Sequence, residues 1–332
     1  MSSTNRRRFL QQTAAAATLL AGTPLLRNAQ SATPDQHKVV ERTDFARLQQ
    51  IADGVWAVVS TPLDGDGNFA HPETICNGGL IAGQDKVLAI DAFLQPAGAA
   101  WLTEKSVELT GKRPTDVIVT HFHADHSGGL AGYQNGVEGP EIYMTETTRQ
   151  LIHERYGVGR PQNNSPFSRP ATRVVGPSQI ITDETQKVKL DLGGRSVTIE
   201  PLSGHTPSDL AIHLDDEPII FAGDLVWSGL FHNYTDAIPS KLRSSVESLL
   251  SDPDKFIVTG HGEIGYAKDL HNYLQLLIWV EEQAKAAHAS GKTAAEGAST
   301  FTIPDHLGQW PRFSANYYEL AFSAWYRELS AH

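Results

Sequence analysis

Three histidines and one aspartate lie within six residues of this chain: His121, His123, Asp125 and His126. The run just before them, residues 116–119, is short and β-branched, which is typical of a buried strand. Side chains that follow such a strand lie beyond its carboxyl end, where open α/β sheets usually build their sites. Imidazole nitrogens and carboxylate oxygens suit zinc, with iron and manganese as alternatives. The segment therefore predicts a metal site at one edge of a sheet.

Three further candidate ligands occur later in the chain: His205, Asp224 and His261. Each comes directly after an expected strand, and each has a glycine as its immediate neighbour. Glycine has no Cβ, so it lets the backbone approach a site closely. We therefore expect these three residues to complete the site.

The combined pattern resembles the metallo-β-lactamase-fold hydrolases over roughly residues 50–270. The resemblance implies an α/β fold, a four-layer αβ/βα sandwich, with the site at the edge between two sheets. It also implies two metal sites with distinct ligands: His121, His123 and His205 for the first, Asp125, His126 and His261 for the second, and Asp224 bridging both.

The chemistry of these residue types predicts a hydrolase. Neutral imidazoles hold zinc at ~2.0–2.1 Å without cancelling its charge, and a pair of metals lowers the pKa of a bridging water towards ~7. Asp125 is the candidate catalytic carboxylate, because it would orient the resulting hydroxide. The chain has no Gly-x-Ser-x-Gly motif that would indicate a serine nucleophile. We therefore expect two Zn²⁺ per chain, with Fe or Mn as alternatives.

Departures from individual subfamilies leave the substrate open. The best-known β-lactamases of this fold have Cys or Ser where this chain has Asp224, and one subclass has a substrate-binding Lys where this chain has Trp227. An Asp at this place is typical of glyoxalase-II-like thioesterases and lactonases. We expect a small-molecule lactone, lactam or thioester as substrate, and His232, Asn233 and Tyr234 as candidate substrate contacts because they follow the Asp224 strand.

Two other enzyme classes remain as alternatives. One is a periplasmic metallo-β-lactamase proper. The other is a mononuclear-iron persulfide dioxygenase, a family that shares the motif but uses only the residues equivalent to His121, His205 and Asp224 as ligands.

The first 32 residues have the composition of an export signal. Three arginines at 6–8 precede a weakly apolar Ala/Leu stretch and small residues at 29–32. The Arg-Arg-x-Phe-Leu sequence resembles a twin-arginine signal, which carries proteins already folded. We expect cleavage after Ser31 or Ala32, a periplasmic or secreted protein, and no stable membrane span after cleavage; a retained anchor is the alternative.

The charge of the remaining chain argues against polyanionic partners. Residues 1–32 contain four of the 27 basic residues and none of the 38 acidic ones, which leaves 23 against 38, a formal charge of −15. Such a surface repels nucleic acid.

We expect a linker over residues 33–50, a metallo-β-lactamase-like domain over 51–290 and a C-terminal helical extension over 291–332. An Asp-Gly turn at 63–68 and a long loop over 157–180 would shape the pocket. The single cysteine, Cys76, forbids an internal disulfide and is expected to be a small buried hydrophobe. An aromatic stripe in the extension, from Tyr317 to Tyr326, is expected to be packing surface that would also serve a homodimer.

Overall fold

The computed structural model describes residues 37–60, 71–134, 139–157 and 176–331. The expected signal segment 1–32, the turn at 63–68 and residues 158–175 of the long loop lie outside the described residues. Among the described helices, none has the length and apolar character needed to cross a membrane.

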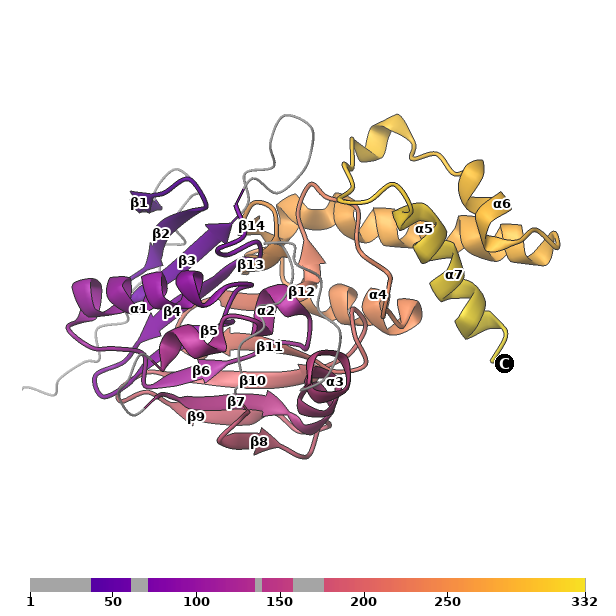
Figure 1. The fold of residues 1–332 in the computed structure, drawn as a ribbon. Coiled ribbons are helices and arrows are strands. Elements are labelled where there is room, and N and C mark those ends of the chain that lie inside the picture. Colours follow the sequence, from indigo (N-terminus) through magenta and orange to yellow (C-terminus); the bar gives the residue numbers. More distant parts are fainter. Residues whose placement is uncertain (1–36, 61–70, 135–138, 158–175, 332) are drawn as a thin grey trace, which may run out of the picture. The chain divides into compact units, whose positions relative to one another are not determined.

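Among the described residues, an eight-stranded sheet forms the first half of the structure (Figure 1). Its strands are β1 (Lys38–Arg42), β2 (Ala46–Ala52), β3 (Val55–Ser60), β4 (Gly78–Ala82), β5 (Val87–Ile90), β6 (Asp116–Ile118), β7 (Glu141–Thr145) and β8 (Gln179–Ile181). Neighbouring strands follow the order of the chain, antiparallel from β1 to β5 and parallel from β5 to β8. The parallel strands therefore end at the same edge of the sheet.

The second sheet is six-stranded in the described part of the chain. Its strands are β9 (Val188–Asp191), β10 (Ser196–Leu202), β11 (Asp209–Leu214), β12 (Ile219–Trp227), β13 (Phe256–His261) and β14 (Gly265–Tyr266). β12 and β13 pair parallel, whereas the other neighbours pair antiparallel. All nine residues of β12 are buried, which explains why its sequence is a nearly continuous apolar run.

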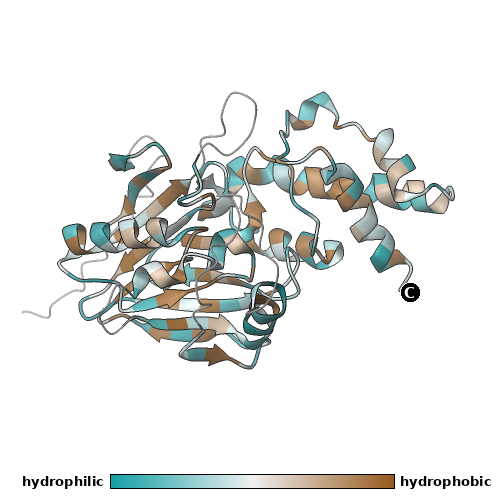
Figure 2. Cartoon of the chain, in the orientation of Figure 1, coloured by the Kyte–Doolittle hydropathy of each residue, from teal (hydrophilic) through white to brown (hydrophobic). Residues whose placement is uncertain are grey.

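Helices cover the outer faces of both sheets (Figure 1). They are α1 (Pro96–Thr110), α2 (Ala124–Ser127), α3 (Glu146–Tyr156), α4 (Pro239–Leu249), α5 (His271–Ala289), α6 (Ala294–Ser299) and α7 (Tyr317–Leu329), with 3₁₀ segments at Leu130–Tyr133, Ala267–Leu270 and Asp305–Leu307. One apolar core joins α1 and α3 to the first sheet, another joins α4, α5 and α7 to the second, and a third lies between the sheets. Figure 2 shows hydrophobic residues both in the strands and along α5. The four-layer αβ/βα sandwich is confirmed.

The residues at both ends of α1 explain where this helix begins and ends. Proline at the first helical position is already fixed at a helical φ, and Pro96 occupies this position in α1. Gly111 ends the helix with φ 73°, and its N–H donates to the carbonyl oxygen of Val107.

The linker expected over residues 33–50 is wrong for residues 38–42 and 46–50, which belong to β1 and β2. In β2, Ala46, Leu48 and Ile51 are buried, while Arg47 and Gln50 are only partly buried. In an antiparallel sheet one face packs on the core and the other can face solvent, where polar residues lie. The charged composition of this stretch therefore hid a half-buried strand.

The C-terminal segment packs on the chain's own helices. Of the predicted aromatic stripe, Tyr317, Phe322 and Trp325 are buried in the core that contains α5. Phe322 and Trp325 are therefore packing residues within the chain, as expected, whereas Tyr317 also reaches the site cavity. None of the three is exposed for a dimer contact.

Candidate metal centre

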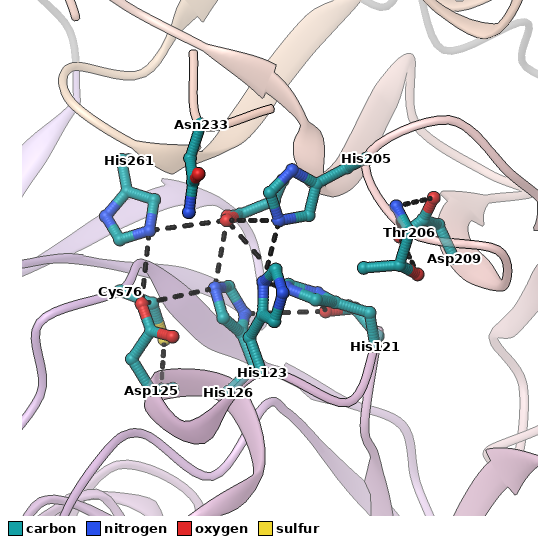
Figure 3. Close-up of polar contacts among 12 residues, drawn as sticks. Cys76, His121, His123, Asp125, His126, His205, Thr206, Asp209, Asn233 and His261 are labelled. Carbon is teal, nitrogen blue, oxygen red and sulfur yellow. Dashed lines mark hydrogen bonds and ion pairs between the residues drawn. The ribbon is translucent and has the colours of Figure 1, made fainter. Parts of the chain in front are cut away.

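All seven predicted ligands gather at one edge of the sandwich, where strand ends of both sheets meet. His121 and His123 follow β6, and Asp125 and His126 lie on α2. The other three come from the second sheet: His205 from the loop after β10, Asp224 from β12 and His261 from the end of β13. Figure 3 shows the labelled ligands converging on one point.

The first group of ligand atoms consists of three imidazole nitrogens and one carboxylate oxygen. His123 Nδ1 lies 3.2 Å from His121 Nε2 and 2.9 Å from His205 Nε2. Asp224 Oδ2 lies 3.2 Å from His205 Nε2 and 3.8 Å from His121 Nε2. The four atoms therefore surround a single point.

The second group consists of Asp125, His126 and His261, and Asp224 reaches it as well. Asp125 Oδ2 lies 3.2 Å from His261 Nε2 and 3.7 Å from His126 Nε2. Asp224 Oδ1 lies 3.1 Å from His126 Nε2, and its Oδ2 lies 3.4 Å from His261 Nε2. One carboxylate thus contacts both groups.

This donor set fits metal ions. Ligands bound tetrahedrally to zinc at ~2.0–2.1 Å stand roughly 3.4 Å apart, close to the separations in both groups. Asp224 Oδ1 and His126 Nε2 are buried, yet neither makes a hydrogen bond of acceptable geometry. A buried polar atom without a partner is costly, and a cation between these atoms would satisfy both.

Hydrogen bonds behind the ligands fix their orientation. His126 Nδ1 lies 2.7 Å from Asp91 Oδ2, and Asp91 accepts hydrogen bonds from the backbone N–H and the hydroxyl of Thr120. Asp91 has φ 62°, which is unusual for a residue other than glycine and is a conformation that clusters at functional sites. A carboxylate behind a histidine ligand fixes its tautomer, so Asp91 leaves Nε2 facing the site. Asp91 was not predicted from the sequence, although it directly follows the apolar residues 87–90 of β5.

His205 is held by His232, which corrects one prediction. His205 Nδ1 lies 3.0 Å from His232 Nε2, and His232 Nδ1 lies 2.9 Å from the Tyr273 hydroxyl, which also reaches the Leu225 carbonyl at 3.2 Å. His232 is fully buried behind the ligand, and burial lowers its pKa to about 3, so it is neutral. It therefore orients His205, and it is not among the described residues that line the site cavity.

Tyr234 is also wrong as a substrate contact. Its side chain is buried in the core between the second sheet and its helices, 6.1 Å from the Phe231 ring centroid. Asn233, between these two residues, does line the site cavity. Whether a loop side chain faces a cleft or a core depends on the path of the loop, which the sequence does not encode locally.

His123 is backed by a carboxylate and a guanidinium that the sequence analysis missed. Its Nε2 lies 3.0 Å from Asp236 Oδ2, and Asp236 Oδ1 lies 2.6 Å from Arg155 Nη2. Arg155 comes from α3 and Asp236 from the loop before α4, so only the folded chain brings them together.

The protonation of the cluster follows from burial and charge. Burial lowers the pKa values of His121 and His205 well below the usual value, and neighbouring imidazoles add to the effect. Burial also lowers the pKa of His261, but Asp224 and Asp125 outweigh it and raise the pKa to about 9. Imidazole binds metal in its neutral form, so a cation would replace the proton that these carboxylates favour.

Cys76 lies beside the cluster as a buried thiol. Its Sγ donates to the Asp125 carbonyl oxygen at 2.9 Å, and burial raises its pKa to about 12. A thiol that stays protonated is a poor ligand, so the small buried hydrophobe predicted for this position agrees with its surroundings.

A cavity of about 390 Å³ opens over the centre. Its described lining includes the ligands His123, Asp125, Asp224 and His261. The other described lining residues are Ile75, Leu94, Ala124, Arg155, Tyr156, Trp227, Asn233, Thr235, Asp236, Phe313 and Tyr317. The cavity suits a small molecule brought against the cluster.

The profile of the metallo-beta-lactamase superfamily matches residues 71–261, more than half of the chain and all seven candidate ligands. The chain belongs to the metallo-beta-lactamase superfamily. Members of this superfamily are metal-dependent hydrolases, and the His/Asp cluster of this chain agrees with metal binding.

Individual members of the superfamily differ in activity. A metallo-beta-lactamase type 2 from Bacillus cereus is 28% identical over 276 residues, covering 78% of this chain and 94% of the relative. The acyl-coenzyme A thioesterase MBLAC2 from Gallus gallus is 25% identical over 169 residues, covering 45% of this chain and 57% of the relative. The crystal structure of a metallo beta lactamase from Hirschia baltica has a TM-score of 0.55 at 20% identity, covering 70% of this chain and 97% of that one. The similarity to the Hirschia baltica structure concerns the fold alone.

Gly260 gives a first prediction for this superfamily site. A Cβ at Gly260 would overlap Asp224 Oδ1, whereas a Cβ at Gly265 meets nothing within 4 Å. Gly260→Ala must therefore displace the shared carboxylate, and we expect metal affinity to fall by about 10–100-fold. Competition with a chromophoric chelator measures this affinity, with Gly265→Ala as the matched control. Equal affinities of the two variants would show that Asp224 does not need its present position.

Proposed function

We propose that this protein is a binuclear zinc hydrolase that opens the carbonyl of a lactone, lactam or thioester. The position of Asp224 supports two metals most strongly: one oxygen lies 3.2 Å from His205 Nε2 and the other 3.1 Å from His126 Nε2. A carboxylate that reaches both ligand groups suits a bridge between two cations. Nitrogen and oxygen donors of this kind favour zinc.

Zinc in these positions would generate a nucleophile from water at neutral pH and polarise the substrate carbonyl. Asp125 is the acidic ligand most open to the cavity, since its side chain is 22% exposed and that of Asp224 only 3%. Asp125 therefore accepts a hydrogen bond from the attacking water and orients it towards the carbonyl carbon.

Of the three predicted substrate contacts, we propose only Asn233. Its Oδ1 accepts hydrogen bonds from the Thr235 backbone N–H at 3.0 Å and the Thr235 hydroxyl at 2.6 Å. This fixes the amide so that its N–H group remains for substrate, and Figure 3 shows the amide end of Asn233 pointing towards the cluster. We propose that it donates to the carbonyl oxygen as negative charge develops there.

A metallo-β-lactamase is the second candidate, because the Bacillus cereus relative aligns over 94% of its own length. The zinc-loaded protein should be assayed with an alkyl lactone, an acyl thioester and a chromogenic cephalosporin. We expect lactone or thioester hydrolysis that stops with a chelator and returns with zinc. Hydrolysis of the cephalosporin alone would favour the second candidate. No hydrolysis, together with oxygen uptake in the presence of a persulfide, would replace both by an iron dioxygenase.

We also propose export by the twin-arginine route, supported by Arg6 and Arg7 ahead of Phe9 and Leu10. Lysine at both arginine positions should keep the protein in the cytoplasm of a bacterial host, while the wild type reaches the periplasm. Equal distribution of the two proteins would contradict this route.

A further inference from the structure

Two residues of the C-terminal segment line the cavity over the metal centre, although they lie outside the part of the chain that matches the superfamily profile. The profile ends at residue 261, and the cavity is also lined by Phe313 and Tyr317. Phe313 lies in the loop before α7, and Tyr317 is the first residue of that helix. The C-terminal segment therefore adds two side chains to the site.

Phe313 extends an aromatic wall that begins at a metal ligand. Its ring centroid lies 5.6 Å from that of His261 and 5.6 Å from that of Trp227, and the Trp227 ring lies 4.5 Å from His261. Ile75 and Leu94 add further apolar lining. An apolar substituent next to the scissile carbonyl would be removed from water against these side chains.

Tyr317 brings an available hydroxyl to the same wall. Its side chain is 9% exposed, and no described residue makes a hydrogen bond with its hydroxyl. A buried tyrosine usually has a partner for its hydroxyl. A phenol is protonated at neutral pH, so the Tyr317 hydroxyl remains a donor.

The charged residues of the lining do not favour an anionic substituent. The described cation in the lining is Arg155, and its guanidinium is already paired with Asp236 at 2.6 Å. An added carboxylate would therefore meet acidic and apolar side chains.

We propose that Phe313 and Tyr317 are substrate-binding residues that select a neutral carbonyl compound with an apolar side chain. Phe313, together with Trp227, contacts the apolar side chain, and the Tyr317 hydroxyl donates a hydrogen bond to a substrate oxygen. This inference rests on the proposed function and narrows its substrate class to apolar lactones, esters or thioesters.

The test uses the zinc-loaded full chain and γ-lactones with butyl, hexyl or octyl side chains, beside one of equal length that ends in a carboxylate. For the wild type, kcat/KM should rise with chain length and fall about tenfold or more for the carboxylate. In Phe313→Ala, kcat/KM should no longer increase with chain length. The change should appear in KM, while kcat is retained. Tyr317→Phe should lower kcat/KM about tenfold, the loss of one hydrogen bond.

Tyr318→Phe is the matched control. Tyr318 is the next residue of α7, but it packs on Phe231 and Phe301 at 4.8 Å and does not line the cavity. Removing the Tyr318 hydroxyl should leave kcat and KM unchanged. All three variants should keep the wild-type metal content. Unchanged chain-length preference in Phe313→Ala, or full activity in Tyr317→Phe, would overturn the inference.

A binding measurement keeps this test independent of turnover. Calorimetry with 2-hexylcyclopentanone, which cannot be hydrolysed, should show about tenfold weaker binding to Phe313→Ala than to the wild type. Equal affinities would overturn the inference even if none of the lactones is a substrate. Absence of lactone hydrolysis by the zinc-loaded wild type, with the affinity difference present, would instead contradict the proposed function alone.

Discussion

Asp224→Ala should remove both metals and lower turnover by about three orders of magnitude. The carboxylate reaches His205 Nε2 at 3.2 Å and His126 Nε2 at 3.1 Å, so its loss takes a ligand from each group at once. Metal ions stabilise developing charge by several kcal/mol, and every 1.36 kcal/mol corresponds to tenfold in rate. Metal content by elemental analysis and kcat on the best substrate should fall together.

The fold should survive this substitution, because the three apolar cores do not depend on Asp224. Asp216→Ala is the control: this aspartate is 44% exposed and pairs with Arg195 on the surface, where ion pairs contribute little. Two metals and full activity in Asp224→Ala would disprove the bridging role.

Phe221→Ala should lower the free energy of unfolding by about 3–5 kcal/mol. Phe221 is 1% exposed and lies in the core between the two sheets. Its ring packs over Gly79 of β4, where any Cβ would meet the ring, so the glycine creates the space that the ring fills. Removing the ring leaves a cavity that the flanking strands cannot close. Chemical denaturation monitored by tryptophan fluorescence measures this loss.

Ile180→Ala on β8 is the matched control. Ile180 is 44% exposed, so its truncation should cost less than about 1 kcal/mol. A similarly small effect of Phe221→Ala would mean that the two sheets are not packed face to face through this core.

The gathering of the seven candidate ligands at one edge was predictable from local sequence, and the four layers followed from the resemblance to the metallo-β-lactamase-fold hydrolases. Five of the seven ligands follow a strand, and Asp224 and His261 lie in the second half of theirs. Strand ends meet at a common edge in this type of fold. Asp91 obeys the same rule after β5 and could have been identified. A polar residue at or just after the carboxyl end of a strand is thus the strongest local signal of this site.

The remaining features depend on contacts between distant segments. The polar alternation of β2 becomes interpretable only when Ala46 and Leu48 on one of its faces pack into the core beneath α1. His232 turned out to lie behind His205 because the loop after β12 turns inward towards Tyr273. Phe313 reaches the cavity through the packing of α7 on α5, which no spacing in the sequence reveals.

The most direct test of the central claim is the metal content of the purified protein, measured together with hydrolysis. We expect two zinc ions per chain, and loss of activity in step with metal removal by a chelator. One iron per chain, no hydrolysis of lactone, thioester or cephalosporin, and oxygen uptake with a persulfide would contradict the assignment of a binuclear zinc hydrolase.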